Sequence, residues 1–312
     1  MPIKVLVCDP IHQDGVALLR KAGFEVEENP SLTPDQLEKE IAEFDAVIVR
    51  GRTKVTSSVL NAGTKLKAVA RSGVGLDNID LDTAKKKSIK VISTPAAPTT
   101  SVAELAVGLM LAVLRKISFA DRAMKEGRWA KAELTGSELK SKTVGVVGAA
   151  GRIGLEVARI SAQGFGAKAI GYDVIDFTEK ARQIGFRAVS QLPELLSESD
   201  IISIHVPYLP ATHHLIDQKA IGSIKKGAIL VNTSRGDIVD GQSLLAALKS
   251  GNLSGAGLDV FHKEPPVDDW EKELVSLPNV VCTSHVGAQT AEAQRLESTI
   301  VAEELIRTLS SK

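Results

Sequence analysis

The sequence of 312 residues predicts an α/β protein built from two doubly wound parallel sheets. Two series of short apolar segments alternate with stretches of helical pattern along almost the whole chain. Most of these segments are continuously apolar, as expected for parallel strands covered by helices on both faces. Strands separated by helices require right-handed crossovers, which produce a doubly wound sheet. A chain of this length is long enough for two such domains.

The first series predicts a domain that ends near residue 98. Its strands are expected in the segments IKVLVCD, FEVEE, AVIVRG, LKAVARSG and IKVIST. A helix is expected over Thr33–Phe44, because Thr33 can act as N-cap, Pro34 suits the first helical position and Gln36 completes a capping box.

The second series predicts another sheet, with strands in TVGVVG, KAIGYD, RAVS, IISIHVP, AILVNTS, GAGLDVF and VVCTSH. A long amphipathic helix is expected over Ala288–Leu309. Because this helix follows the last strand, we expect it to return to the first domain. The predicted domains are therefore residues 1–98 with 288–312, and residues 99–287.

Composition limits the partners and the location. Lys and Arg total 38, as do Asp and Glu, so neither nucleic acid nor an anionic membrane is an expected partner. Cys8 and Cys282 lie in apolar strands and are expected to be buried thiols in a reducing compartment. The chain enters a strand at Ile3–Val7 without a signal segment. The apolar helix Ser101–Lys116 contains Glu104 and is too short to span a bilayer, so we expect a cytoplasmic protein.

The segment TVGVVGAAGRIGLEVARI contains the glycine turn of a nucleotide site. Gly148, Gly151 and Gly154 are spaced GxxGxxG, one residue longer than the usual GxGxxG. A strand precedes the turn and a helix follows it, which favours a dinucleotide site over a plain tight turn. Gly151 would let the backbone approach a pyrophosphate, and Gly154 would let the helix pack closely on the sheet. The helix N-terminus and Arg152 would supply positive charge.

Asp173 ends the next predicted strand, where a carboxylate can bind ribose hydroxyl groups. The same carboxylate would repel a 2′-phosphate, and the following residues VID contain no Arg or Lys to neutralise it. The predicted cofactor is therefore NAD rather than NADP.

Three polar residues follow strands of the second series: Arg235, Glu264 and His285. Ligands of parallel sheets bind beyond the carboxyl ends of the strands. An arginine can hold a substrate carboxylate, a histidine can transfer a proton near neutral pH, and a neighbouring carboxylate can stabilise the protonated histidine. Individually, Arg235 could cap a turn, Glu264 could be a solvated acid and His285 could be a satisfied strand-end histidine. Together they predict carbonyl reduction beside a nicotinamide.

No metal site is predicted. His213 and His214 are adjacent, so their side chains are expected to point apart, and no acid or cysteine lies at ligand spacing. His205 is expected to lie near the cofactor without acting as an acid or base.

Several motifs resemble the D-isomer-specific 2-hydroxyacid dehydrogenase family. They are VNTSRGDIVDGQSLLAALKSGNLSGAGLDVFHKEPP with TSHVGAQT, GRWAKAELTGSELKSKTVGVVGAAGRIG, ARSGVGLDNIDLDTAKKKSIKVISTP and SVAELAVGLMLAVLRK. The resemblance covers nearly the whole chain. It implies a flavodoxin-like substrate-binding domain (1–98 with 288–312) and a Rossmann NAD-binding domain (99–287). It also implies that Arg235, Glu264 and His285 form the catalytic set.

The resemblance implies further cofactor contacts. Besides the three glycines, the expected residues are Val74, Arg152, Ile153, Asp173, His205, Val206, Pro207, Thr233, Ser234, Asp259, Gly287 and Ala288. Asp259 could instead be only a strand-end acid, although the family places it beside the nicotinamide carboxamide.

The loop VRGRTKVT resembles that of family members that act on 3-phosphoglycerate. Its cations Arg50, Arg52 and Lys54 suit a phosphate, although a solvated basic loop is the alternative. The residues expected to bind substrate are Arg50, Gly51, Arg52, Ser72, Gly73, Val74 and Gly75, and the backbone N–H groups of the last three are expected to face a carboxylate. Pro98 replaces an Asn found in many relatives, so that contact is expected to be lost or taken over by Thr99.

The resulting hypothesis is an NAD-dependent dehydrogenase of a D-2-hydroxy acid, and the first candidate substrate is the phosphorylated acid 3-phosphoglycerate. The alternatives are a glyoxylate or hydroxypyruvate reductase and, outside enzymes, an NAD(H)-sensing corepressor-like protein. The resemblance implies a homodimer, with a tetramer as the alternative. Because the sequence ends at Lys312, we expect it to lack the C-terminal regulatory domain of longer relatives.

Overall fold

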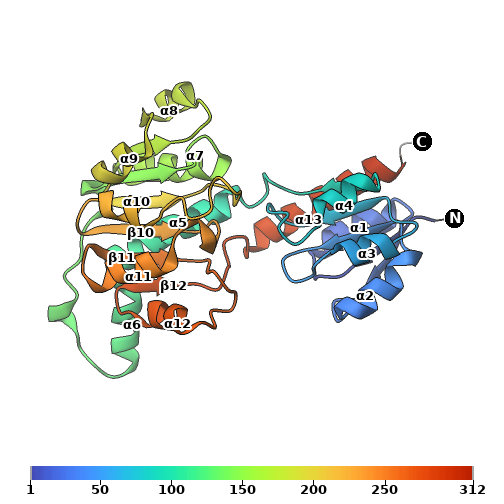
Figure 1. Ribbon diagram of the computed structural model, residues 1–312, viewed down its shortest axis with the longest axis horizontal. Helices are drawn as coiled ribbons and strands as arrows, with labels where there is room; N and C mark the ends of the chain where they lie inside the picture. Colours follow the sequence, from blue (N-terminus) through green and yellow to red (C-terminus); the bar gives the residue numbers. More distant parts are fainter. Residues whose placement is uncertain (1, 311–312) are drawn as a thin grey trace. The chain divides into compact units, whose positions relative to one another are not determined.

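The computed structural model describes residues 2–310. The chain forms two compact units, one of which contains the chain up to Pro98 and again from Ala288 onward. Thr99–Gly287 form the other unit. Figure 1 shows the elements of both units coloured along the chain.

The first unit contains a parallel sheet with the strand order β2-β1-β3-β4-β5, which is the flavodoxin-like order. Its strands are β1 (Lys4–Val7), β2 (Glu25–Glu28), β3 (Ala46–Val49), β4 (Ala68–Arg71) and β5 (Lys90–Ile92). Its α-helices are α1 (Gln13–Lys21), α2 (Pro34–Glu40), α3 (Ser57–Ala62), α4 (Leu81–Lys86) and α13 (Ala291–Ser310). Separate apolar clusters bury α1 with α13 on one face of the sheet and α2, α3 and α4 on the other.

Local chemistry explains the boundaries of two helices in this unit. The capping box of α2 is confirmed, with Thr33 Oγ1 accepting from Gln36 N and Gln36 Oε1 accepting from Thr33 N. This helix ends at Glu40 and continues as a 3-10 turn over Ile41–Glu43, so it is shorter than predicted. The C-terminal helix α13 begins at Ala291, where Thr290 Oγ1 caps Ala293 N. It packs on α1, as expected.

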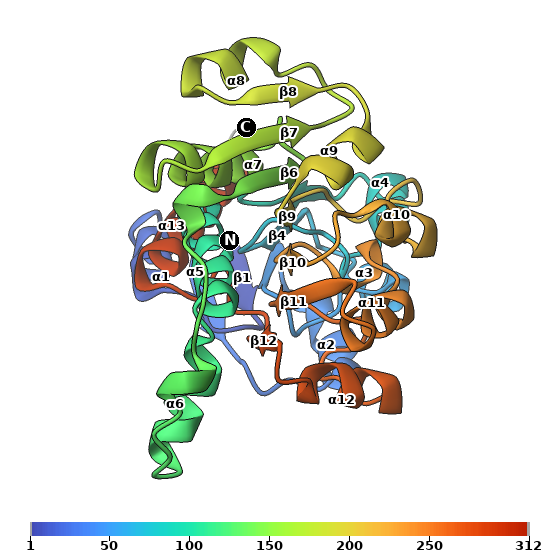
Figure 2. The same ribbon diagram turned by 90° about the vertical axis from the view of Figure 1, so that its left-hand side faces the viewer.

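The second unit contains a parallel sheet with the order β12-β11-β10-β9-β6-β7-β8. Figure 2 shows these strands in the order of the sheet, with β8 at one edge and β12 at the other. The strands are β6 (Thr143–Val147), β7 (Lys168–Tyr172), β8 (Arg187–Val189), β9 (Ile201–Ile204), β10 (Ala228–Asn232), β11 (Leu253–Leu258) and β12 (Val280–Cys282). The reversal of strand order between β6 and β9 is that of the Rossmann fold, at the point where such sheets bind nucleotides.

Helices cover both faces of the second sheet. One apolar cluster includes α5 (Thr99–Leu114), α7 (Arg152–Arg159) and α8 (Thr178–Ile184). The opposite cluster includes α9 (Leu192–Glu198), α10 (Gln218–Ser223), α11 (Gly241–Lys249) and α12 (Asp269–Ser276). Helix α6 (Ile117–Lys125) extends away from this sheet in both views (Figures 1 and 2). The remaining helical turns are Ile160–Gly164, which is a π-turn, and the 3-10 turns Lys131–Glu133, Leu139–Ser141 and Gly236–Ile238.

The predicted fold class is confirmed, since every expected strand is present and all pairings are parallel. The prediction that both cysteines are buried is wrong for one of them. Cys8 is buried in the central strand β1, whereas Cys282 is exposed because it ends the edge strand β12. Within residues 2–310, none of the helices combines the length and the apolar character needed to cross a membrane.

Candidate active site

The carboxyl ends of β10, β11 and β12 bring a histidine and a carboxylate into direct contact. Nδ1 of His285 lies 2.7 Å from Oε2 of Glu264. The other oxygen of Glu264 accepts a hydrogen bond of 3.3 Å from Phe261 N. Because the carboxylate occupies Nδ1, Nε2 is the ring nitrogen left to exchange a proton with a ligand.

The charge state of Glu264 suits this contact. Partial burial raises the pKa of Glu264, but the hydrogen bond and charge of His285 oppose that effect. The N–H of Phe261 and the charge of Arg235 act in the same direction, so the pKa lies below the ordinary value. Glu264 is therefore an anion at neutral pH and stabilises a positive charge on His285.

Asp259 fixes the turn that carries His285. Its buried carboxylate accepts hydrogen bonds from Thr283 Oγ1 (2.6 Å), Val286 N (2.8 Å) and Gly287 N (2.9 Å). Its carbonyl accepts from His285 N at 2.8 Å. His285 has a φ of 54°, in the left-handed region, which these bonds hold in place. Asp259 thus orients the histidine from within the strand end.

Arg235 lies in a loop that the side chain of Asn232, at the end of β10, holds in shape. Asn232 Nδ2 donates to Arg235 O (2.8 Å), and Asn232 Oδ1 accepts from Ser234 N (3.0 Å). A Cβ on Gly236 would lie 2.1 Å from the carbonyl carbon of Phe261, so only glycine permits this approach. Arg235 is close enough to lower the pKa of Glu264. The three predicted catalytic residues are therefore neighbours within one unit.

The glycine turn accommodates its extra residue by forming a tight turn. Gly148 has a φ of 91°, and a Cβ there would lie 2.7 Å from the carbonyl of His205. Gly151 N donates to Gly148 O at 3.2 Å, which closes the turn. A Cβ on Gly154 would lie 2.3 Å from Gly148 O, so α7 needs a glycine to start this close to the strand. Within this longer turn, the N–H group of Ala150 donates to Asp173 Oδ2 at 2.9 Å.

These residues fit a dinucleotide. Gly151 caps α7 without a side-chain hydrogen bond, and a Cβ there would approach only Gly148 O, at 3.3 Å. The first N–H groups of α7 are therefore accessible to a pyrophosphate, with exposed Arg152 beside them. Asp173 is held at the turn by Ala150 N and by Ile175 N (3.1 Å). The buried hydroxyl of Thr233 has no hydrogen-bond partner among residues 2–310 and can be satisfied by a ligand.

His205 and Ser234 connect the turn to the Arg235 loop. Ser234 Oγ donates to Val206 O at 2.5 Å. His205 Nε2 lies 2.8 Å from Ser203 Oγ, and burial lowers the pKa of His205 to about 3. This histidine is therefore neutral at physiological pH. The other predicted cofactor residues lie near the same strand ends. Val206 and Pro207 follow β9, Ile153 lies in the first turn of α7, and Gly287 and Ala288 follow β12.

The expectation that His213 and His214 point apart is wrong. Their rings stack with centroids 4.0 Å apart, because His214 adopts a left-handed φ of 48°. In the described part of the chain, residues 2–310, there is no group of three or more His, Cys, Asp or Glu residues that could hold a metal ion.

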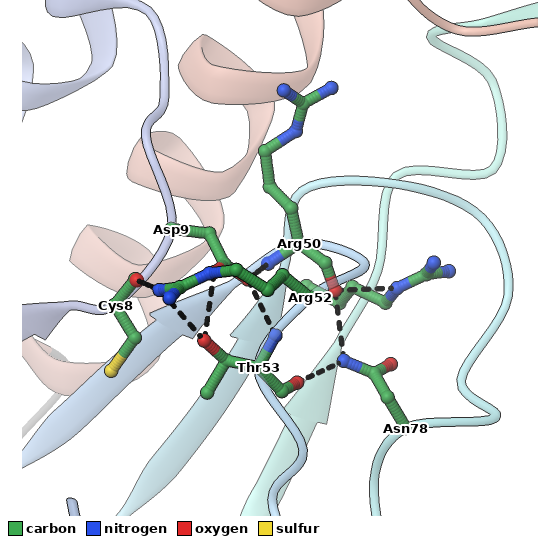
Figure 3. Close-up of polar contacts among 7 residues, drawn as sticks. Cys8, Asp9, Arg50, Arg52, Thr53 and Asn78 are labelled. Carbon is green, nitrogen blue, oxygen red and sulfur yellow. Dashed lines mark hydrogen bonds and ion pairs between the residues drawn. The ribbon is translucent and has the colours of Figure 1, made fainter. Parts of the chain in front are cut away.

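The basic loop of the first unit is organised by Asp9, a residue that the sequence analysis did not identify (Figure 3). The carboxylate of Asp9 is 2% exposed and accepts from Arg50 N (2.6 Å), Arg52 Nε (3.0 Å), Thr53 N (3.2 Å) and Thr53 Oγ1 (2.8 Å). Arg52 Nη2 also donates to Cys8 O at 2.6 Å. The charge of Arg52 is therefore largely balanced within the fold. Asp9 could have been identified from the sequence, because it stands just after the end of β1.

Arg50 has a different environment from Arg52. Its guanidinium points away from Asp9 (Figure 3) and lies 3.7 Å from the carboxylate of Glu297. Its carbonyl accepts from Arg71 Nε (3.2 Å) and Asn78 Nδ2 (2.8 Å), which holds the loop against β4. Gly51 and Lys54 are exposed.

The glycine segment after β4 meets the expectation only in part. The N–H of Gly73 donates to Thr94 Oγ1 at 2.9 Å, so it is not available to a substrate carboxylate. Val74 and Gly75 remain candidates, and the carbonyl of Gly75 accepts from Arg71. Ser72 is buried. Pro98 is buried directly before α5, and Thr99 is the first residue of that helix.

Comparison with known proteins agrees with this geometry. Residues 107–287 match the family model for the NAD-binding domain of D-isomer-specific 2-hydroxyacid dehydrogenases. A D-3-phosphoglycerate dehydrogenase of Methanocaldococcus jannaschii is 44% identical over 98% of the chain, which spans 57% of that relative. A hydroxypyruvate reductase of Thermotoga maritima is 45% identical, with 98% of both chains covered.

A solved structure supports the same assignment. D-lactate dehydrogenase of Aquifex aeolicus, complexed with NAD and lactic acid, has a TM-score of 0.83 and 31% identity, with 99% of this chain and 94% of that chain covered. Both the sequence match and the fold thus extend over both units. The chain belongs to the D-isomer-specific 2-hydroxyacid dehydrogenase family and carries its NAD-binding domain.

Proposed function

We propose that this protein is an NAD-dependent dehydrogenase of a small D-2-hydroxy acid, with 3-phosphoglycerate and 3-phosphohydroxypyruvate as the first candidate pair. The observation that carries the proposal is the contact of 2.7 Å between Glu264 and His285, with Arg235 beside it. These three residues meet at the carboxyl ends of the sheet that carries the glycine turn. In this proposal the second unit binds NAD and the first unit binds the substrate.

The residues can perform carbonyl reduction as follows. NADH supplies the hydride when it is bound. Arg235 would hold the substrate carboxylate and polarise the carbonyl, while Nε2 of protonated His285 would donate a proton to the carbonyl oxygen. Glu264 would stabilise the imidazolium before the transfer, and neutral His285 would take the hydroxyl proton in the reverse direction.

A panel of 2-oxo acids tests the activity, with the oxidation of NADH followed by the loss of its absorbance. The panel should contain 3-phosphohydroxypyruvate, hydroxypyruvate, glyoxylate and pyruvate. Reduction of none of them would contradict the proposed enzyme and leave the NAD(H)-sensing alternative.

Hydroxypyruvate or glyoxylate is the second candidate substrate, and two observations favour it. Asp9 already balances Arg52, which reduces the positive charge that the loop offers to a phosphate. The hydroxypyruvate reductase of T. maritima also matches along 98% of its own length. A higher kcat/KM for hydroxypyruvate than for its phosphate ester would decide for this alternative.

Asp173 should select NADH over NADPH, because its carboxylate lies at the glycine turn and would repel a 2′-phosphate. We expect Asp173→Ala to narrow the ratio of kcat/KM values for the two cofactors. Asp176→Ala, which removes a nearby exposed carboxylate of the same loop, is the matched control and should leave the ratio unchanged. Equal use of both cofactors by the unaltered protein would contradict the assignment.

Arg50 should contribute more to phosphate binding than Lys54. Arg50→Ala should raise KM for 3-phosphohydroxypyruvate and leave KM for hydroxypyruvate nearly unchanged, since a charge-assisted contact is worth roughly 1.5–3 kcal/mol. Lys54→Ala removes an exposed cation of the same loop and serves as the control. Arg52→Ala should instead lower thermal stability, because it leaves the buried Asp9 without its cation. Equal effects of Arg50→Ala on both substrates would favour the hydroxypyruvate alternative.

We also propose that the protein is a cytoplasmic homodimer, with a tetramer as the alternative. Helix α6 and the segment after it expose apolar side chains, with Trp129 78% and Met124 56% exposed. Burial of these side chains in a second copy would remove this surface from water. Light scattering should give the mass of a dimer, and Trp129→Lys should shift it toward a monomer; a monomeric unaltered protein would contradict this part of the proposal.

A further inference from the structure

Glu297 is a fully buried carboxylate next to the proposed phosphate-binding arginine. It lies on α13 and is 0% exposed. Its Oε2 lies 3.7 Å from Nη2 of Arg50, whose side chain is 20% exposed. Within residues 2–310, neither carboxylate oxygen has a partner at full hydrogen-bond geometry, although the Ser72 hydroxyl lies close enough to lower the pKa of Glu297. Glu297 thus interacts with Arg50 mainly through charge, without the bidentate hydrogen bonds of a structural ion pair.

The surroundings of Glu297 contain cations from two neighbouring strand ends. Arg50 follows β3 and Arg71 ends β4, and both act on Glu297, as does the nearby hydroxyl of Ser72. On α1, which also packs against α13, Asp14 is paired with exposed Arg295. Arg20 of the same helix is paired with Glu28. Asp9 contacts the backbone N–H of Arg50, but its charge is paired with that of Arg52. Near Glu297 the balance is therefore two arginines against one carboxylate.

We propose that Glu297 sets the charge selectivity of the substrate unit, by offsetting Arg50 and so limiting the affinity of the Arg50 site for dianionic groups such as a phosphate. This inference rests on the proposed function, because it assumes that Arg50 binds the anionic substituent of the substrate. Glu297 acts through Arg50 and is a positioning residue that does not itself contact the substrate.

The reasoning is electrostatic. With Glu297 ionised, the pair of arginines and the carboxylate carry one net positive charge; with Glu297 neutral, they carry two. A carboxylate this close to Arg50 repels an anion that binds on the other side of the guanidinium. The effect is large because the group is buried and weakly screened.

Glu297 can also change its charge in response to a bound anion. Burial raises the pKa of Glu297, and the charges of Arg50 and Arg71 and the Ser72 hydroxyl offset this only in part. An anion on Arg50 should raise that pKa further, since it weakens the favourable interaction of the carboxylate with the arginine. By linkage, protonation of Glu297 and anion binding should favour each other.

Sulfate is the probe, because it stays dianionic at all pH values of interest, unlike a phosphate ester. The inhibition constant of sulfate would be measured in competition with a 2-oxo acid that the protein reduces. NADH would be saturating, so that it occupies the glycine turn. Glu297→Gln should lower this constant about tenfold at high pH, and the difference from the unaltered protein should shrink as the pH falls and Glu297 becomes protonated. The same variant should raise kcat/KM for 3-phosphohydroxypyruvate relative to hydroxypyruvate.

Glu303→Gln is the matched control, because it removes an exposed carboxylate from the same helix. It should change the sulfate constant little at any pH. An unchanged or weakened sulfate affinity in Glu297→Gln at every pH would overturn the proposal. If Glu297→Gln lowered the melting temperature and changed kcat/KM equally for both substrates, the variant would have lost packing in general. That result would also contradict the proposal.

A second measurement needs neither activity nor a stable variant. The carboxyl carbon of Glu297 can be followed by NMR in the unaltered protein with NADH, with and without sulfate. We expect sulfate to raise its titration midpoint; an unmoved midpoint would overturn the proposal. If no 2-oxo acid is reduced, the proposed function fails while this titration still tests Glu297.

Discussion

Replacement of His285 by alanine should lower kcat by about 10²–10⁴-fold, the usual contribution of a positioned acid or base. The carbonyl oxygen gains negative charge as hydride arrives, and the variant has no group at Nε2 to donate a proton to it. The affinity for NADH should change little, because the glycine turn and Asp173 lie on other strands. Steady-state kinetics and NADH titration by fluorescence measure the two effects separately.

Loss of the fold is the main alternative explanation for a slow variant, so a second substitution is needed. His285→Gln keeps a polar side chain on the same turn, and its melting temperature should match that of the unaltered protein. It should be as slow as His285→Ala, because an amide cannot transfer the proton. Near-normal turnover in either variant would show that another residue is the proton donor.

Glu264→Gln should affect the pH profile more than the binding of NADH. The pKa of Glu264 lies below its ordinary value, so the carboxylate is ionised throughout the neutral range. Replacing it by an amide removes the negative charge beside Nδ1 of His285, and the protonated imidazole then persists only at lower pH. The alkaline limb for reduction should therefore move to lower pH. An unmoved limb would mean that Glu264 does not support the charge of His285.

Most of the fold could be predicted from the sequence because the strands are buried on both faces. Continuous apolar runs such as Ala228–Val231 have few alternatives to a central parallel strand. The capping box at Thr33 likewise specifies a helix start from residues three positions apart. Edge positions carry less information, which is why the exposure of Cys282 at the end of β12 was not predicted.

The proximity of Arg235, Glu264 and His285 could be predicted, because the carboxyl ends of parallel strands lie along one edge of the sheet. Contacts that depend on three-dimensional packing could not. Asp9 and Arg52 are 43 positions apart, and their hydrogen bond requires β1 and β3 to be neighbours. Glu297 lies on a helix that returns to the first unit, and its pattern in the sequence is that of an ordinary helical acid. The N–H of Gly73 is occupied because Thr94 follows the adjacent strand.

Arg235 should differ from His285 in the way its loss appears in the kinetics. Arg235→Ala should raise KM and lower kcat together, because the guanidinium would hold the substrate carboxylate and polarise its carbonyl in the same complex. Loss of a charge-assisted contact costs roughly 1.5–3 kcal/mol in binding alone, which corresponds to about 10–150-fold. The further decrease in kcat would report the polarisation of the carbonyl.

Arg235→Lys separates charge from geometry. Lysine keeps the positive charge but cannot form the two parallel hydrogen bonds of a guanidinium with a carboxylate. It should recover part of the binding and little of kcat, if the fork orients the carbonyl toward His285. Full recovery by lysine would mean that charge alone is needed at this position. A change in kcat with an unaltered KM would mean that a group other than Arg235 holds the carboxylate.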